Sequence, residues 1–459
     1  MLPSTASLRR CTASGDHARR PIVHIARIDP SPNHPEEVTI TVEVTPTRRE
    51  SRWEGNTRTD ESGAFDLRLF RDGQLVGHAP SDDTGRSPLN PYGAERPPID
   101  PYTLAEDGPV PLDPGTGKAT IAFPHIRIPG AGPADVAFSA YAFNADRVKS
   151  ETDRRTFTRP RLPPRRGRAY LISLGVNAYE NPALDLRFAA TDARRLQQTL
   201  GDEIARTGEY EEVVRIPLIS DYRIEAGLHV LTEATATRRN LETVLMLLAG
   251  RDVDAARRRA VPGGDRIRPA IPEDLVLLTV SSHGYAGDDG IFYLLPYDSG
   301  PGRERSITPA NLAQSISSGL LARWMRDIDA VDLVMIVDAC NSAATVEGGG
   351  FKPGPMGSRG LGQLAYDKGM RILAATKSHD VALESEKTGM GLLTFALLRE
   401  GLERARADRG PPDGRITVEE WLAFGLEEVP VLAERMLSGD GAGKGLVLLA
   451  PDGAKPAPS

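Results

Sequence analysis

The chain of 459 residues carries 56 Lys and Arg against 63 Asp and Glu, a formal net charge of −7. This balance argues against a nucleic-acid partner, which normally calls for a basic excess on one face. Its two cysteines, Cys11 and Cys340, exclude a disulfide framework and a thiolate zinc site. Because no apolar stretch reaches signal-peptide or membrane-spanning length, we expect a cytoplasmic protein with no membrane partner.

The first part of the chain, residues 21–158, is predicted to be an all-β domain. VTITVEV (Val38 to Val44) and FDLRLF (Phe65 to Phe70) alternate apolar and polar residues, as half-buried strands do. Asp72-Gly73 is a hairpin-turn signal. Short strands with such connections favour an immunoglobulin-like sandwich. Two polar insertions, near 46–63 and 80–118, are expected to be flexible loops.

Three further segments are predicted to lie outside the packed domains. Residues 1–20 are polar, small and basic. This segment and residues 451–459 are expected to be disordered tails. Residues 159–167 are dense in Pro and Arg, which predicts a linker. A solvated spacer is one interpretation of this linker, and a site of self-cleavage after an arginine is the other.

From residue 168 to 450 the pattern changes to α/β. Continuous apolar runs predict strands that are buried on both faces, namely RAYLISLGV, EEVVRIPLI, DLVLLTV, DLVMIV and MRILAAT. Segments with helical spacing separate or follow them, among them LRFAATDARRLQQTL, TRRNLETVLMLLAG and GLLTFALLREGL. Alternating strands and helices predict a mostly parallel sheet with helices on both faces.

Residues whose side chains can take part in catalysis follow two of these strands. DLVLLTV leads into Ser281-Ser282-His283-Gly284, and DLVMIV leads into Asp338-Ala339-Cys340. Functional groups of a doubly wound sheet gather just beyond the carboxyl ends of its strands. If the two strands are neighbours, His283 and Cys340 will therefore meet there.

A thiol and an imidazole in contact can perform nucleophilic catalysis. A free thiol, with a pKa of about 8.5, is mostly protonated near neutral pH, and an adjacent imidazole can take its proton. Backbone N–H groups of Cys340 and Gly284 could then stabilise an oxyanion. Taken singly, each residue also has a structural interpretation, as a buried cysteine and a hydrogen-bonded histidine.

Three blocks between Arg168 and Ala450 resemble the caspase-like cysteine peptidases, which include caspases, metacaspases and bacterial orthocaspases. The blocks are RAYLISLGVNAYEN with LRFAATDARRL, DLVLLTVSSHG, and DLVMIVDACNSA. The resemblance implies a caspase-like fold, a protein or peptide substrate, His283 as general base and Cys340 as nucleophile. The alternative is a non-catalytic scaffold of the same fold. A dinucleotide-binding protein is disfavoured because LGVNAYENP lacks the glycine-rich turn.

The resemblance also implies which residue precedes the cut. Animal caspases have Gln two positions before the cysteine, where this chain has Asp338. A carboxylate repels aspartate and attracts arginine or lysine. Likeness to metacaspases places a second pocket carboxylate at Asp192, with Asp185 as an alternative, and a pocket serine at Ser281. We therefore expect cleavage after basic residues.

The same resemblance suggests that the loop after the nucleophile is a place of regulatory cleavage. The Gly- and Pro-rich loop 347–362 contains Lys352 and Arg359, which would suit self-cleavage by a basic-specific enzyme. A plain flexible loop is the alternative. The sandwich that precedes the protease is expected to position a substrate, to dock a regulatory protein partner or to restrain the protease, and a fold alone does not decide among these roles.

The resemblance to metacaspases raises calcium as a candidate cofactor. Asp298, Glu347 and the pair Asp288-Asp289 fall near calcium positions of metacaspases. Calcium requires six to eight oxygen ligands, and too few carboxylates match. We therefore predict no metal and no cofactor, and keep calcium dependence as the alternative.

Overall fold

The computed structural model describes residues 20–53, 56–80, 108–130, 132–161, 163–286, 291–339, 359–375, 384–385, 389–436 and 446–449. The chain divides into two compact units. Unit 1 comprises Met1–Ile128 and Gly132–Leu162, and unit 2 comprises Pro129–Ala131 and Pro163–Ser459. Both predicted tails, apart from Arg20, lie outside the described residues.

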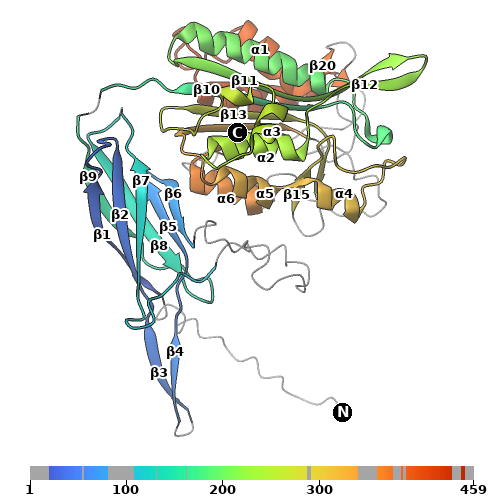
Figure 1. Ribbon diagram of the computed structural model, residues 1–459. Helices are drawn as coiled ribbons and strands as arrows, with labels where there is room; N and C mark the ends of the chain where they lie inside the picture. The colour runs from blue at the N-terminus through green and yellow to red at the C-terminus, as the bar shows by residue number, and fades with distance from the viewer. Residues whose placement is uncertain are drawn as a thin grey trace, which may run out of the picture. The chain divides into compact units, whose positions relative to one another are not determined.

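Unit 1 is built from antiparallel sheets, two of which enclose a common core (Figure 1). One has the strand order β1-β2-β7 and the other β6-β5-β8-β9. Their bounds are β1 (Ile22–Pro30), β2 (Glu37–Thr45), β5 (Phe65–Arg71), β6 (Gln74–Ala79), β7 (Ala119–Arg127), β8 (Asp135–Phe143) and β9 (Asp153–Thr158). Ile25 and Ile40 from the first sheet pack in one cluster with Leu67 and Phe138 from the second. The prediction of an all-β part is confirmed.

Two local predictions for unit 1 are wrong. The insertion expected to be a flexible loop near 46–63 forms a hairpin, in which β3 (Arg48–Trp53) pairs with β4 (Asn56–Glu61). Strand β5 is buried on both faces, not on one. Arg68 can lie inside because Asp66 neutralises it at 2.6 Å. Residues 81–107 of the other insertion lie outside the described residues.

The hairpin turn in unit 1 is confirmed. Arg71 of β5 pairs directly with Gln74 of β6, so the turn consists of Asp72 and Gly73. Both have positive φ, +48° and +85°, as a tight two-residue turn of this kind requires.

Unit 2 contains a seven-stranded sheet with the order β12-β11-β10-β13-β17-β18-β21. Its strands are β10 (Arg168–Val176), β11 (Glu212–Glu225), β12 (Leu228–Ala234), β13 (Leu275–Ser281), β17 (Asp332–Asp338), β18 (Arg371–Ala375) and β21 (Leu446–Leu449). The five central strands are parallel, and the two edge strands β12 and β21 are antiparallel. The predicted mostly parallel sheet is confirmed.

Helices cover both faces of this sheet, as predicted (Figure 1). Helices α1 (Ala189–Thr207), α7 (Leu392–Phe395) and α8 (Val418–Met436) pack on one face. Helices α2 (Arg238–Leu248), α5 (Ser318–Met325) and α6 (Arg359–Lys368) pack on the other. The remaining elements are α3 (Ala255–Ala260), α4 (Pro309–Gln314), a π-helix (Ala396–Glu403), the small sheet β14 (Gly284–Ala286), β15 (Phe292–Leu294) and β16 (Ile316–Ser317), and β19 (Glu384–Ser385) with β20 (Met390–Gly391). Among the described helices, none has the length and apolar character needed to cross a membrane.

The sequence prediction missed one hairpin of unit 2. Strand β11 pairs with β10 only as far as Ser220, but it continues to Glu225 and returns as β12. Its turn residues, Ala226 and Gly227, both have positive φ. Figure 1 shows β12 on the outer side of β11. The hairpin therefore extends past the end of the parallel strands.

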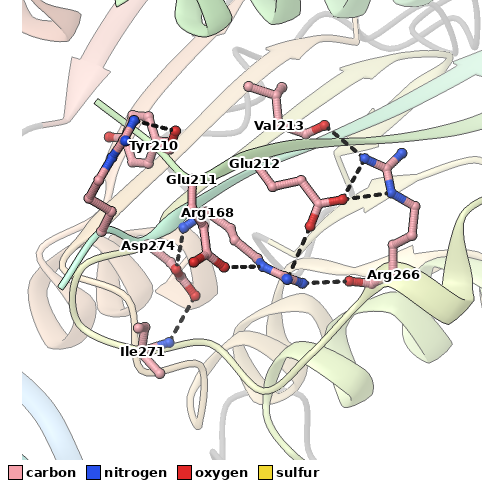
Figure 2. Close-up of polar contacts among 9 residues, drawn as sticks. Arg168, Tyr210, Glu211, Glu212, Val213, Arg266, Ile271 and Asp274 are labelled. Atoms are coloured by element: carbon pink, nitrogen blue, oxygen red, sulfur yellow. Dashed lines mark hydrogen bonds and ion pairs between the residues drawn. The ribbon is translucent and has the colours of Figure 1, made fainter. Parts of the chain in front are cut away.

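A charged cluster fixes the amino ends of the parallel strands (Figure 2). Arg168, the first residue of β10, donates to Glu211 at 2.7 Å, and its backbone N–H donates to Asp274 at 2.6 Å. Arg266 donates to Glu212, the first residue of β11, at 2.7 Å. This cluster lies at the opposite strand ends from Ser281 and Asp338, so it anchors the fold and not the candidate site.

The predicted linker 159–167 is divided between the two units. Its last part, from Pro163, belongs to unit 2. Arg166 donates to the carbonyls of Gly208 and Tyr210, just beyond the end of α1. The end of the linker is therefore attached to unit 2.

Candidate active site

The residues expected to carry chemistry follow neighbouring strands. Strand β13 lies between β10 and β17, and in this parallel register Ser281 is level with Gly175 on one side and with Asp338 on the other. The three parallel strands therefore end side by side at the same edge of the sheet. The backbone N–H of Ser282 donates to the carbonyl of Asp338 at 3.4 Å, which continues the contact past the strands.

The two segments remain in contact one residue further on. A methyl group added to Gly284 would lie 2.9 Å from the carbonyl oxygen of Ala339 and 2.8 Å from the ring of Phe292. Glycine is needed at this point because a side chain would separate the two chain segments. Ala339 directly precedes Cys340, and Cys340 itself lies outside the described residues. The structure thus brings the His283-Gly284 segment against the residue before the predicted nucleophile.

Two groups hold His283 in place. Its backbone N–H donates to the hydroxyl oxygen of Tyr179 at 2.9 Å, and the two rings lie 5.3 Å apart between centroids. Its ring Nε2 lies 2.8 Å from the carbonyl oxygen of Leu184. Both partners belong to the loop between β10 and α1, which the sequence analysis did not connect with the histidine.

The contact with Leu184 determines which ring nitrogen can act as a base. A carbonyl oxygen only accepts hydrogen bonds, so Nε2 carries the hydrogen and Nδ1 of the neutral ring is left as the acceptor. Burial lowers the pKa of His283, and the charge of the nearby Arg305 acts in the same direction, whereas the hydrogen bond to Leu184 and the negative charge of Asp185 oppose the shift. The imidazole is therefore neutral near pH 7, the form that can accept a proton.

Gly284 can offer a backbone donor. Leu295 donates its N–H to the carbonyl of His283, while Gly284 is opposite Leu294 in the β14–β15 pair. In an antiparallel ladder this pattern makes Gly284 and Leu294 a pair without mutual hydrogen bonds. The N–H of Gly284 is consequently directed away from β15, as an oxyanion donor would need to be.

Two carboxylates predicted for the specificity pocket converge. Asp192 on α1 and Asp338 at the end of β17 come from different elements, and α1 packs closely on β10 at Gly175, where a methyl group would lie 2.6 Å from Ala193. A methyl group on Gly391 would lie 2.8 Å from Asp192 Oδ2 and 3.1 Å from Asp338 Oδ2. Both side chains therefore face the same point.

Asp192 and the two other pocket predictions, Ser281 and Asp185, have different surroundings. Asp192 is buried and accepts the N–H of Gly391 at 2.8 Å. Ser281 is buried at the end of β13, level with Asp338. Asp185, the alternative to Asp192, does not join the pair at Gly391. It instead accepts the N–H of Tyr179 at 2.9 Å and contacts His229 at 2.6 Å.

Asn177 is a further buried residue near the site that the sequence analysis did not single out. Its side-chain oxygen accepts the N–H of Ala190 at the start of α1, and its side-chain nitrogen donates to the carbonyl of Arg187 and to Asp221. Every polar atom of this amide thus ties the β10–α1 loop to its surroundings. Its position directly after a buried strand was the one available signal.

The residues predicted for self-cleavage and for calcium lie mostly outside the described residues. Lys352, Glu347, Asp288 and Asp289 lie outside the described residues, and Arg359 begins α6 with its side chain outside them. Asp298 accepts the N–H of Arg238 at the start of α2, at 2.9 Å. Within the described ranges, no group of three or more His, Cys, Asp or Glu side chains could hold a metal ion.

No protein-family model matches the chain, and a search of curated proteins finds no match either.

Proposed function

We propose that this protein is a cysteine endopeptidase of the caspase type that cleaves after arginine or lysine. The observation that carries the proposal is the approach of Gly284 to Ala339, where a methyl group on the glycine would lie 2.9 Å from the carbonyl oxygen. It supports a site in which His283 and Cys340 act together at the ends of β13 and β17. In this proposal, unit 2 has a caspase-like fold and unit 1 an immunoglobulin-like one.

The chemistry begins with the thiol of Cys340. Nδ1 of His283 takes its proton, and the thiolate sulfur attacks the carbonyl carbon of the peptide bond. Backbone N–H groups of Gly284 and Cys340 stabilise the negative oxygen of the tetrahedral intermediate. The proton on Nδ1 then passes to the leaving amine as the carbon–nitrogen bond breaks. Water, activated by the same imidazole, hydrolyses the remaining thioester.

The convergence of Asp192 and Asp338 supports a basic residue before the cut. A guanidinium can donate in parallel to carboxylate oxygens, and it would replace the mutual repulsion of two carboxylates by attraction. An aspartate side chain would meet the same two negative groups unfavourably. Ser281, level with Asp338, completes the proposed pocket.

An assay with fluorogenic peptides tests the proposal. Wild type should cleave peptides ending in Arg or Lys, with and without calcium, and leave those ending in Asp intact. Cys340→Ala and His283→Ala should each lower kcat/KM by at least about 1,000-fold. Equal activity of wild type and Cys340→Ala, or no cleavage by either, would favour a non-catalytic scaffold. Cleavage after Asp but not Arg would contradict the pocket assignment.

Self-processing and partner binding belong to the same proposal. Lys352 and Arg359 are the proposed self-cleavage positions, and unit 1 is the proposed docking module for a regulatory protein. Incubated wild type should yield fragments on a denaturing gel that Cys340→Ala does not. Identical banding of the two proteins would exclude self-cleavage under those conditions.

A further inference from the structure

Asp185 occupies a special place in the loop between β10 and α1. Its side chain is only 6% exposed. One carboxylate oxygen accepts the backbone N–H of Tyr179 at 2.9 Å, and the other lies 2.6 Å from Nδ1 of His229. The first contact ties residue 185 back to residue 179, so that Asp185 closes the loop on itself.

The two residues at the ends of this closed loop are those that hold His283. Tyr179 accepts the backbone N–H of the histidine, and Leu184, the neighbour of Asp185, accepts Nε2–H. A shift of residue 185 would therefore move Tyr179 and Leu184 together. Asp185 contacts Tyr179 and directly follows Leu184, so its influence on His283 passes through these two residues.

The second contact of Asp185 reaches the β11–β12 hairpin. His229 lies on β12, and its ring stacks on Tyr222 of β11, with centroids 3.8 Å apart and planes at 12°. A carboxylate with so little exposure needs a donor to compensate its lost hydration, and the stacked His229 supplies one in a fixed orientation. The hairpin missed by the sequence analysis thus supports the loop that holds the histidine.

We infer that Asp185 is a positioning residue for His283, with His229 as its partner. Together they hold Tyr179 and Leu184 so that Nε2 of the histidine keeps its hydrogen and Nδ1 remains the acceptor. The catalytic consequence rests on the proposed function. The orientation and protonated nitrogen of His283 do not, because they can be measured without substrate.

Histidine nitrogen NMR tests the inference directly. In protein labelled with ¹⁵N-histidine, the His283 signals are assigned by their loss in His283→Gln. Wild type should show the form with hydrogen on Nε2. Asp185→Ala should show a mixture of the two neutral forms, whereas Asp185→Asn, which keeps an acceptor for Tyr179, should lie closer to wild type. Signals in Asp185→Ala identical to wild type would overturn the inference.

Two further variants separate positioning from general stability. His229→Phe keeps a ring on Tyr222 but loses the hydrogen bond, and it should shift the His283 signals in the same direction as Asp185→Ala. Glu242→Gln removes a partly buried ion pair on α2, where Arg257 lies at 2.9 Å, and should leave those signals unchanged. An equal shift in Glu242→Gln would mean that general loosening causes the effect, which would contradict the inference.

Kinetics provide the second measurement. In the peptide assay, Asp185→Ala should lower kcat by about 10- to 100-fold, the usual effect of a displacement of about 1 Å, with KM changed far less. If wild type cleaves no peptide but the NMR signals respond, the proposed function fails and the positioning inference stands. If wild type is active and Asp185→Ala keeps both its signals and its kcat, the positioning inference fails alone.

Discussion

At the scale of single residues, the account depends on the state of His283. The carbonyl of Leu184 accepts Nε2–H, so the nitrogen that remains as a base is Nδ1. Burial lowers the pKa of the ring. A histidine that served only to fill space would not require this fixed orientation, whereas a general base does.

The lowered pKa of His283 predicts the acidic limit of activity. Its ordinary value is 6.5, and only the neutral ring can accept the thiol proton. Because the folded-state pKa is lowered, the ring stays neutral to a lower pH, and kcat/KM should fall only below pH 6.5. A profile of kcat/KM for an arginine peptide between pH 4.5 and 8 measures this. An acidic limit above pH 6.5 would contradict the assigned environment.

The carboxylates of the proposed pocket make a second prediction. Asp192→Asn and Asp338→Asn should each lower kcat/KM for an arginine peptide by about 10- to 100-fold, since a hydrogen bond to a charged group contributes about 1.5–3 kcal/mol. Asp202→Asn is the matched control, because Asp202 lies on the same helix as Asp192 but pairs with Arg215 at 2.6 Å. Unchanged arginine cleavage in both pocket variants would remove the basis for the specificity.

Sequence reasoning reached only part of this site. His283 could be predicted because it follows a long apolar strand, and Asp338 because it ends one. Functional side chains of a parallel sheet lie preferentially at these strand ends. Tyr179 and Leu184 could not, since a hydroxyl and a backbone carbonyl acquire their roles only from the path of a loop. Asp185 was considered for the pocket, but it contacts Tyr179 and His229 instead, because spacing does not reveal which way a loop carboxylate points.

At the scale of elements, the adjacency of β13 and β17 positions the site. Ser281 and Asp338 are paired in register, and Gly284 lies against Ala339 just beyond them. The strands themselves were predictable from their apolar runs. The β11–β12 hairpin was not, because its turn is Ala226-Gly227 and its residues are largely exposed, so no apolar run marked it.

The close contact at Gly284 predicts the effect of one methyl group. Gly284→Ala places a carbon 2.8 Å from Phe292 and 2.9 Å from Ala339 O, so it should destabilise unit 2 by about 1–3 kcal/mol and abolish most activity. Gly319→Ala on α5 is the control, because its added carbon would meet no neighbouring element within 4 Å. Urea unfolding and peptide cleavage measure the two effects. Wild-type behaviour of Gly284→Ala would show that the two segments are not packed this closely.

At the scale of the whole molecule, each unit has its own core. The main cluster of unit 1 draws on residues between Val23 and Phe157, and the two large clusters of unit 2 draw on residues from Ala169 to Ala433. A change from period-2 strands to long apolar runs made this division visible in the sequence. The position of the boundary between the two units was harder to predict. A Pro- and Arg-rich composition does not reveal that Arg166 donates to backbone carbonyls after α1.

Separate cores predict that unit 2 folds without unit 1. Residues 163–459 alone should unfold in one cooperative thermal transition. They lose the hydrogen bond from Gly130 to Glu273, 2.7 Å in the whole chain, which contributes about 0.5–1.5 kcal/mol. The Tm of the fragment should therefore lie within about 5 °C of the corresponding transition of the whole protein. Loss of cooperative unfolding would contradict independent folding.

Covalent labelling tests most directly whether Cys340 is a nucleophile served by His283 beside an acidic pocket. A peptide chloromethyl ketone ending in arginine is incubated with the whole protein, and the modified residue is mapped by mass spectrometry. The account predicts one adduct, on Cys340 and not on Cys11, with much slower labelling in His283→Ala and little labelling by the aspartate analogue. Equal labelling of both cysteines, or labelling of Cys340 that is indifferent to His283 and to the peptide's last residue, would contradict it.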